Sequence, residues 1–224
     1  MDQTAKFFAM HKILPTLLIV AALCANACGC PPDEKTGTLN LTAAAQSFLP
    51  YNGSETLTFT DETGAELTLQ LPRGQELKTD QLCYRTTCTE AKYNTPSSCE
   101  YYDADSRRYT FFGAGNTVVV DLLVYSAVYD YGMPVFYDAL QVGFSVGTPS
   151  IIGHHLIEAR FTEPFDTTKL GISDFFQERP TLVLNGQAFS NALAYEEGNM
   201  GVYIEQGTGI IGFKNAEHIW VVQQ

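Results

Sequence analysis

The sequence predicts an all-β protein, an antiparallel meander of about ten to twelve strands that forms a sandwich or an irregular barrel, with at most one short helix. Three observations support this fold class. Apolar and polar residues alternate with a period of two along many short segments. Turn-forming residues recur at intervals of about eight to twelve residues. The longest apolar stretch, "NTVVVDLLVYSAVYD" at residues 116–130, is rich in the β-branched and aromatic residues that strands favour.

The first strands form a hairpin. In "ETLTFT" (residues 55–60), Leu57 and Phe59 share one face, and threonines occupy the other. The turn "DETG" follows, and "AELTLQL" (residues 65–71) then repeats the alternation with leucines. This pattern predicts two strands with one buried face.

The middle of the chain continues the meander. Further strands are expected over residues 80–88, 98–104, 107–113, 116–130, 133–147 and 154–161. The segment "DTTKLGISDFFQERP" (residues 166–180) is the predicted place for a short helical turn, with Ser173 as its N-cap. The last strands follow the tight-turn pair Asn185-Gly186 and end with "EHIWVV".

The N-terminus predicts export. The apolar stretch from Ile13 to Ala27 is about 15 residues long, which suits the core of a signal peptide and is short for a membrane span. Lys6 and Lys12 provide the basic residues that precede such a core. We predict a signal peptide over residues 1–29, with Met10 as an alternative start.

The cysteines that end this stretch, in "ANACGC", follow small residues, and the segment resembles the lipobox of bacterial lipoproteins. The resemblance implies acylation, including palmitate, at Cys30, with Cys28 as the alternative. Alanine replaces the leucine that the family usually has three residues before the cysteine. Because Pro31 rather than Asp follows Cys30, the resemblance implies the outer membrane, on its periplasmic or surface side. Residues 30–45 are then a flexible tether and residues 46–224 a single β domain.

Three more cysteines, Cys83, Cys88 and Cys99, lie in the predicted domain. In an oxidising compartment they predict one disulfide and one remaining thiol. The favoured pair is Cys88 with Cys99, which flank a polar loop, and the alternative is Cys83 with Cys99. Their spacing lacks the CxxC signature of zinc sites, so no metal is expected.

The charge of the chain excludes one class of partner. The chain carries 13 basic and 25 acidic residues, a net charge of −12. Without residues 1–29, 11 basic and 24 acidic residues remain, a net charge of −13. Nucleic-acid binding requires a basic face, so we expect no nucleic-acid partner. The expected partners are the membrane, through the lipid, and a glycan or an envelope protein.

The C-terminal third also resembles a known class of protein. Its glycine, aromatic and Ile-Ile pattern is similar to the closing segment of uncharacterised bacterial cell-envelope lipoproteins. The matching residues are Gly186, Phe189, Asn191, Tyr203, Gly207, Gly209, Ile210, Ile211, Phe213 and Trp220. The resemblance implies a β-rich exported domain and no catalytic residue. Gly209, within a strand, also predicts a bulge or close packing against a ring.

The sequence contains no convincing catalytic constellation. His154 and His155 are adjacent in a predicted strand, so they point to opposite faces and cannot easily share a metal, and Glu158 does not join His155. Ser145 lies in "GFSVG", the string of a hydrolase elbow, yet its surroundings are strands rather than a strand and a helix. We therefore expect a non-catalytic protein without a cofactor. A secreted hydrolase is the less favoured alternative.

A group of tyrosines is the one candidate for ligand contact. Tyr129, Tyr131 and Tyr137 lie around the turn after the long strand, close in sequence to aspartates. Exposed tyrosines of this kind stack on sugars or meet a protein partner. The alternative function is therefore a glycan-binding surface lipoprotein.

Overall fold

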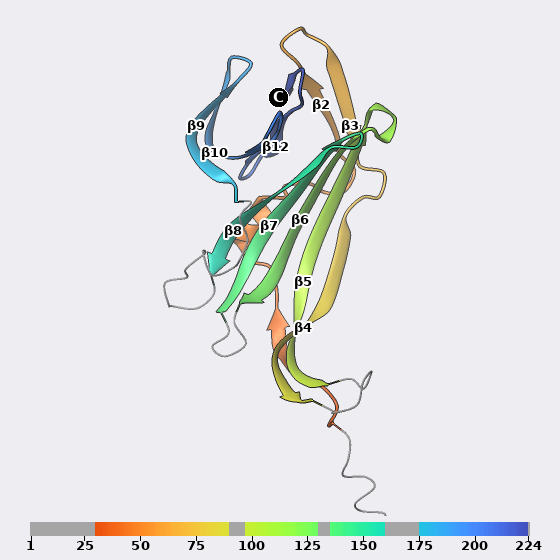
Figure 1. The fold of residues 1–224 in the computed structure, drawn as a ribbon, viewed down its shortest axis with the longest axis vertical. Coiled ribbons are helices and arrows are strands. Elements are labelled where there is room, and N and C mark those ends of the chain that lie inside the picture. Colours follow the sequence, from red (N-terminus) through yellow and green to blue (C-terminus); the bar gives the residue numbers. More distant parts are fainter. Residues whose placement is uncertain (1–29, 90–96, 130–134, 160–174, 224) are drawn as a thin grey trace, which may run out of the picture. The chain divides into compact units, whose positions relative to one another are not determined.

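A computed structural model describes residues 30–89, 97–129, 135–159 and 175–223 (Figure 1). Within these residues the chain forms thirteen strands, one short α-helix and one 3₁₀ turn. The elements are β1 (Glu34–Leu39), α2 (Ala43–Ser47), β2 (Thr56–Thr60), β3 (Glu66–Gln70), β4 (Glu76–Cys88), β5 (Ser98–Gly113), η1 (Ala114–Asn116), β6 (Val118–Tyr129), β7 (Val135–Val146), β8 (Ser150–Ala159), β9 (Gln177–Leu184), β10 (Gln187–Glu197), β11 (Met200–Glu205), β12 (Gly209–Lys214) and β13 (Ile219–Val222). The predicted all-β class is confirmed.

The described residues divide into two compact units. The small unit comprises residues 30–34, 85–89 and 97–100, and the large unit comprises the others. The sequence predicted instead a flexible tether over residues 30–45 and a single domain after it. Part of that predicted tether forms β1, which pairs with β5, and the start of α2.

The large unit contains a continuous antiparallel sheet. Its strand order is β8-β7-β6-β5-β3-β2-β13-β12-β11-β10-β9, and it curls into a half-barrel. Figure 1 shows β5, β6, β7 and β8 side by side as long strands. The two ends of this order meet at one point, where His154 and Phe175 form a bridge and the N–H of Phe176 donates to the carbonyl of His154 at 2.8 Å.

The strands follow from the period-two pattern. Along β6, Val120, Leu122 and Val124 are fully buried, whereas the residues between them are partly exposed. β6 pairs with β7 without interruption, from Val118 opposite Val146 to Tyr129 opposite Val135. The buried side chains belong to the main apolar core, which extends from α2 to β12. A second apolar cluster, which includes Phe189, Tyr203 and Ile211, covers the other face of the C-terminal strands.

The single helix differs in place from the predicted one. It begins after Thr42, whose hydroxyl accepts a hydrogen bond from the N–H of Ala45, an ordinary N-cap. Of the predicted helical segment, residues 166–174, including Ser173, lie outside the described residues, and residues 177–180 belong to β9. Among the described residues, no helix has the length and apolar character needed to cross a membrane.

The last strand joins the first hairpin. β13 pairs with β2, with Val221 opposite Thr60 and Val222 opposite Phe59. The N–H of Gln223 continues this pairing by donating to the carbonyl of Thr58 at 2.8 Å. We call the β2–β13 pairing the seam, because it brings residues near 60 next to residues near 220.

Candidate functional site

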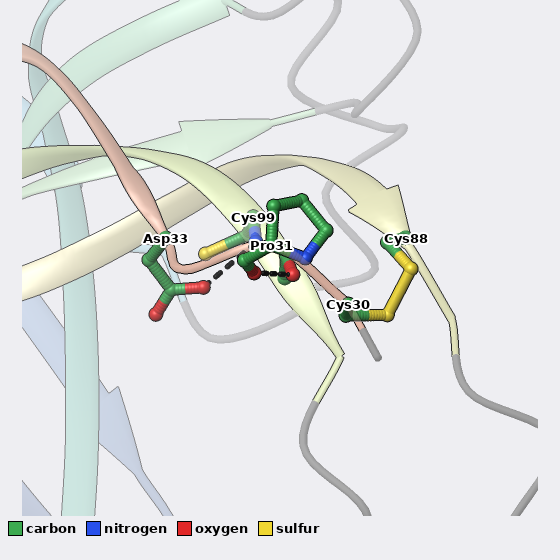
Figure 2. Close-up of a disulfide and its surroundings, with 6 residues drawn as sticks. Cys30, Pro31, Asp33, Cys88 and Cys99 are labelled. Atoms are coloured by element: carbon green, nitrogen blue, oxygen red, sulfur yellow. Dashed lines mark hydrogen bonds between the residues drawn. A yellow bond between two sulfur atoms is a disulfide. The ribbon is translucent and has the colours of Figure 1, made fainter. Parts of the chain in front are cut away.

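A disulfide ties the start of the described chain to the end of β4. Cys30 and Cys88 are bonded, with Cα atoms 5.5 Å apart and a sequence separation of 58 (Figure 2). Two hydrogen bonds hold the residues after Cys30 against the beginning of β5. Ser98 Oγ donates to the carbonyl of Pro31, and the N–H of Cys99 donates to Asp33 Oδ1 at 2.9 Å. Residues 30–33 are therefore built into the small unit.

This disulfide overturns the predicted pairing. Cys88 cannot pair with Cys99, because its sulfur is bonded to Cys30. Cys83 and Cys99 are disulfide-bonded as well, so no thiol remains among the three cysteines of the predicted domain. Sequence reasoning missed this because it assigned Cys30 to export and counted an odd number of cysteines. The alternative pairing of Cys83 with Cys99 stays a prediction.

The same bond contradicts acylation at Cys30. A lipid joined to the cysteine sulfur needs a free thiol, and the sulfur of Cys30 is engaged in the bond to Cys88. The alternative residue, Cys28, lies outside the described residues. Acylation at Cys28 stays a prediction.

The predicted tyrosine group does not form an exposed platform. Tyr137 is 7% exposed and pairs with Ala127 inside the sheet. Burial raises the pKa of Tyr137 to about 12. Tyr129 is half-buried, and Tyr131 lies outside the described residues. The sugar-stacking role predicted for Tyr137 is therefore wrong, since a buried ring has no open face.

The reactive-looking motifs lie in regular strands. His154 and His155 pair with Gln141 and Leu140 of β7, so they alternate across the sheet as expected. The ring of His155 packs against Phe48 with centroids 5.5 Å apart. Burial lowers the pKa of His155. Ser145 lies within β7 opposite Ser150, without a helix after it. The structure does not bring these residues into a catalytic group.

A cavity lies at three hairpin turns of the large unit. Its volume is about 640 Å³, within the usual range for a small-molecule site. We call it the turn pocket, because the β7–β8, β10–β11 and β12–β13 turns line it. Its lining residues are Val146, Pro149, Ser150, Ile151, Glu197, Gly198, Asn199, Met200, Asn215, Ala216 and Glu217.

The lining of the turn pocket combines buried apolar side chains with exposed acidic ones. Ile151 and Met200 are buried and supply apolar surface. Glu197 and Glu217 are exposed and are the ionisable side chains of the lining. Glu197 accepts a hydrogen bond from the Tyr195 hydroxyl at 3.2 Å. The lining therefore combines negative charge with apolar surface and lacks an aromatic ring on which a sugar would stack.

A carboxylate–imidazole cluster lies at the end of the seam. His218 Nδ1 is 3.2 Å from Asp61 Oδ2 and 3.0 Å from Glu62 Oε1. Burial raises the pKa of Asp61, but hydrogen bonds from Thr63 and Ala65 outweigh this effect and lower it overall. Backbone hydrogen bonds from Glu62 itself and from Ile219 lower the pKa of Glu62. Sequence reasoning missed this cluster, because His218 is more than 150 positions away from Asp61 and Glu62.

Comparison of the chain with protein-family models, with curated proteins and with solved structures finds no match. The resemblance of the N-terminal and C-terminal segments to envelope lipoproteins therefore stays a prediction.

Proposed function

We propose that this protein is a bacterial envelope lipoprotein, anchored through acyl chains on Cys28, whose β domain binds a ligand rather than catalysing a reaction. One observation carries the choice of residue. The Cys30 sulfur belongs to the disulfide with Cys88, which leaves Cys28 as the cysteine in the lipobox-like segment that has small residues before it. A cut before Cys28 also keeps Cys30 in the mature chain, where the disulfide needs it.

Two further features support export and anchoring. Disulfides persist in oxidising compartments, and four described cysteines are disulfide-bonded. Two or three acyl chains on one cysteine give stable attachment, whereas a single chain binds a membrane marginally. Gly29, rather than Asp, follows Cys28. By the resemblance to sorted lipoproteins, this favours the outer membrane.

Metabolic labelling with palmitate tests the anchor residue. We expect wild-type protein and Cys30→Ser to carry label, and Cys28→Ser to carry none. Cys88→Ser is the matched control, because it loses the same disulfide as Cys30→Ser and keeps both N-terminal cysteines. Loss of label in Cys30→Ser, with label retained in Cys28→Ser and Cys88→Ser, would place the lipid on Cys30 and refute the assignment.

A second candidate function is the binding of a small organic cation in the turn pocket. The favouring observation is that its only ionisable lining side chains, within the described part of the chain, are Glu197 and Glu217, in a lining that also includes the apolar Ile151 and Met200. A cation with a short apolar segment matches both features, since like charges would repel an anion.

Calorimetric titration with spermidine tests this candidate. We expect Glu197→Gln and Glu217→Gln each to weaken binding about fivefold, the effect of one exposed ion pair of about 1 kcal/mol. Glu66→Gln, which removes an equal charge outside the pocket, should leave the affinity unchanged. Equal losses in all three variants would indicate general attraction to an acidic protein.

A further inference from the structure

The seam places three potential metal ligands at one point. Asp61 and Glu62 directly follow the last residue of β2, and His218 directly precedes the first residue of β13. Because β2 and β13 pair in antiparallel register, these two positions come together at the same end of the strands. The cluster thus joins parts of the chain that are remote in sequence.

The three donor atoms have the spacing of a metal's coordination shell. His218 Nδ1 lies 3.2 Å from Asp61 Oδ2 and 3.0 Å from Glu62 Oε1, and all three atoms lie within 4.8 Å of one another. In a tetrahedral zinc site with bonds of about 2.0–2.1 Å, neighbouring ligand atoms are about 3.3 Å apart. Small side-chain adjustments would therefore bring the donors to bonding distance of one ion.

In each carboxylate, the oxygen that does not face His218 accepts hydrogen bonds that fix the side chain. Asp61 Oδ1 accepts hydrogen bonds from the N–H groups of Thr63 and Ala65, both at 2.8 Å, and from the Thr63 hydroxyl at 2.7 Å. Glu62 Oε2 accepts a hydrogen bond from the N–H of Ile219 at 3.1 Å. Such contacts orient metal ligands and raise affinity. They leave Asp61 Oδ2 and Glu62 Oε1 directed at the same imidazole nitrogen.

His218 is positioned through its backbone and its ring. The N–H of His218 donates to Asn215 Oδ1 at 2.8 Å, which fixes its backbone. Its ring lies edge-on to Trp220 with centroids 6.0 Å apart. Its other nitrogen, Nε2, lies 4.0 Å from Glu217 Oε2. This distance is too long for a hydrogen bond, and an ion at Nδ1 would take the place of the proton shared with Asp61 and Glu62.

We propose that Asp61, Glu62 and His218 form a binding site for a divalent transition metal ion, with Zn²⁺ the preferred occupant. Imidazole with carboxylates suits zinc, whereas calcium and magnesium select oxygen donors. The side chain of Asp61 is 2% exposed, and those of His218 and Glu62 are 31% and 45% exposed. The site is therefore anchored on one side and open to an ion from solvent on the other.

The bound metal ion would stabilise the folded chain. It would link the first hairpin to the last strand, which a short pairing otherwise holds together. A ligand that binds only the folded chain stabilises it by mass action. The inference concerns the large unit and is independent of the lipid anchor.

Calorimetric titration of the purified, metal-stripped full chain with ZnCl₂ tests the site. We expect tight binding in wild type, and binding weakened at least about tenfold in Glu62→Gln and His218→Gln. Even substitution of a residue that only hydrogen-bonds to a metal ligand weakens metal binding about 10-fold to 100-fold. Glu66→Gln is the matched control, because it removes a carboxylate of the same hairpin that is outside the cluster. Glu62 is exposed enough for its variant to fold.

A site-specific measurement decides between this cluster and other zinc ligands, including the N-terminal cysteines. In long-range ¹H–¹⁵N spectra, added Zn²⁺ should shift Nδ1 of His218 and leave His154 and His155 unchanged. The proposal is overturned if no Zn²⁺ binds. It is also overturned if both variants bind as wild type does, or if the shifts appear at another histidine. In those cases the cluster is a hydrogen-bonded contact between His218 and the carboxylates.

Discussion

Tyr51 shows how one side chain connects separate parts of the core. Its ring meets Tyr109 and Phe111 edge-on, with centroids 5.5 and 5.0 Å away. Its hydroxyl accepts a hydrogen bond from the N–H of Ile210 at 2.7 Å, and its carbonyl accepts one from the Tyr109 hydroxyl at 2.7 Å. Burial raises its pKa, so the hydroxyl stays neutral. The ring lies directly over Gly209, which confirms the close packing predicted for that glycine.

Gly209→Ala tests this contact. A methyl group there would lie 2.1 Å from the Tyr51 hydroxyl oxygen, on a backbone with φ of +84°. We expect a loss of unfolding free energy of about 3 kcal/mol, because both strain and overpacking contribute. Gly207→Ala is the control for strain alone, since its φ is +86° and no atom lies within 4 Å of the added carbon. Equal losses in urea denaturation would contradict the Tyr51 contact.

Glu55 provides a pH-dependent test at the turn before β2. Its carboxylate accepts hydrogen bonds from the N–H groups of Asn52, Gly53 and Ser54. Burial raises the pKa of Glu55, but these hydrogen bonds outweigh burial and lower it below the ordinary value of 4.5. The stabilising effect is therefore present above pH 4.5 and is lost as the pH falls through the lowered pKa.

We accordingly expect Glu55→Gln to be less stable than wild type by about 1 kcal/mol at pH 7. The difference should shrink as the pH falls below 4.5 and through the lowered pKa, where the carboxyl group of the wild type becomes protonated. Urea denaturation at several pH values measures it. A difference that stays constant from pH 7 to pH 3 would show that the charge of Glu55 does not matter.

At the scale of elements, the period-two pattern predicted most strands, because alternation reports directly which face is buried. It failed where a bulge changes the phase. Tyr203 pairs with Gly212 and Ile204 with Ile210, so Ile211 is an extra residue in β12. As a result Ile211 packs in the second apolar cluster, whereas Phe213 packs in the main core. In a regular strand two residues at i and i+2 share a face, so alternation alone predicts the same face for both.

The end of β4 is covalently linked to the start of the described chain. The Cys30–Cys88 bond closes a loop with a sequence separation of 58 residues, which corresponds to about 4 kcal/mol of chain entropy in the unfolded state. We expect Cys88→Ser to lower the unfolding free energy by about 2–4 kcal/mol, measured by urea denaturation without reductant. Cys30→Ser should lose the same amount, and the double variant no more than either single variant. Additive losses would contradict the pairing.

At the scale of the whole molecule, the sequence predicted the fold class and missed what joins distant segments. The sequence of β1, "EKTGTL", has little alternation and therefore predicts a tether. Its pairing with β5 is a tertiary effect. The Cys30–Cys88 bond and the cluster at His218 depend on registers between strands far apart in the chain. Local patterns contain no information about such registers, which explains both omissions.

The arrangement of the N-terminal cysteines is the central claim, and one measurement tests it directly. Non-reducing peptide mapping of membrane-extracted protein by mass spectrometry reports acylation and disulfide bonding in the same molecule. We expect a mature chain that begins at Cys28, with acyl chains on Cys28 and with Cys30 bonded to Cys88. A chain that begins at an acylated Cys30, or one with no acyl chain, would contradict the account.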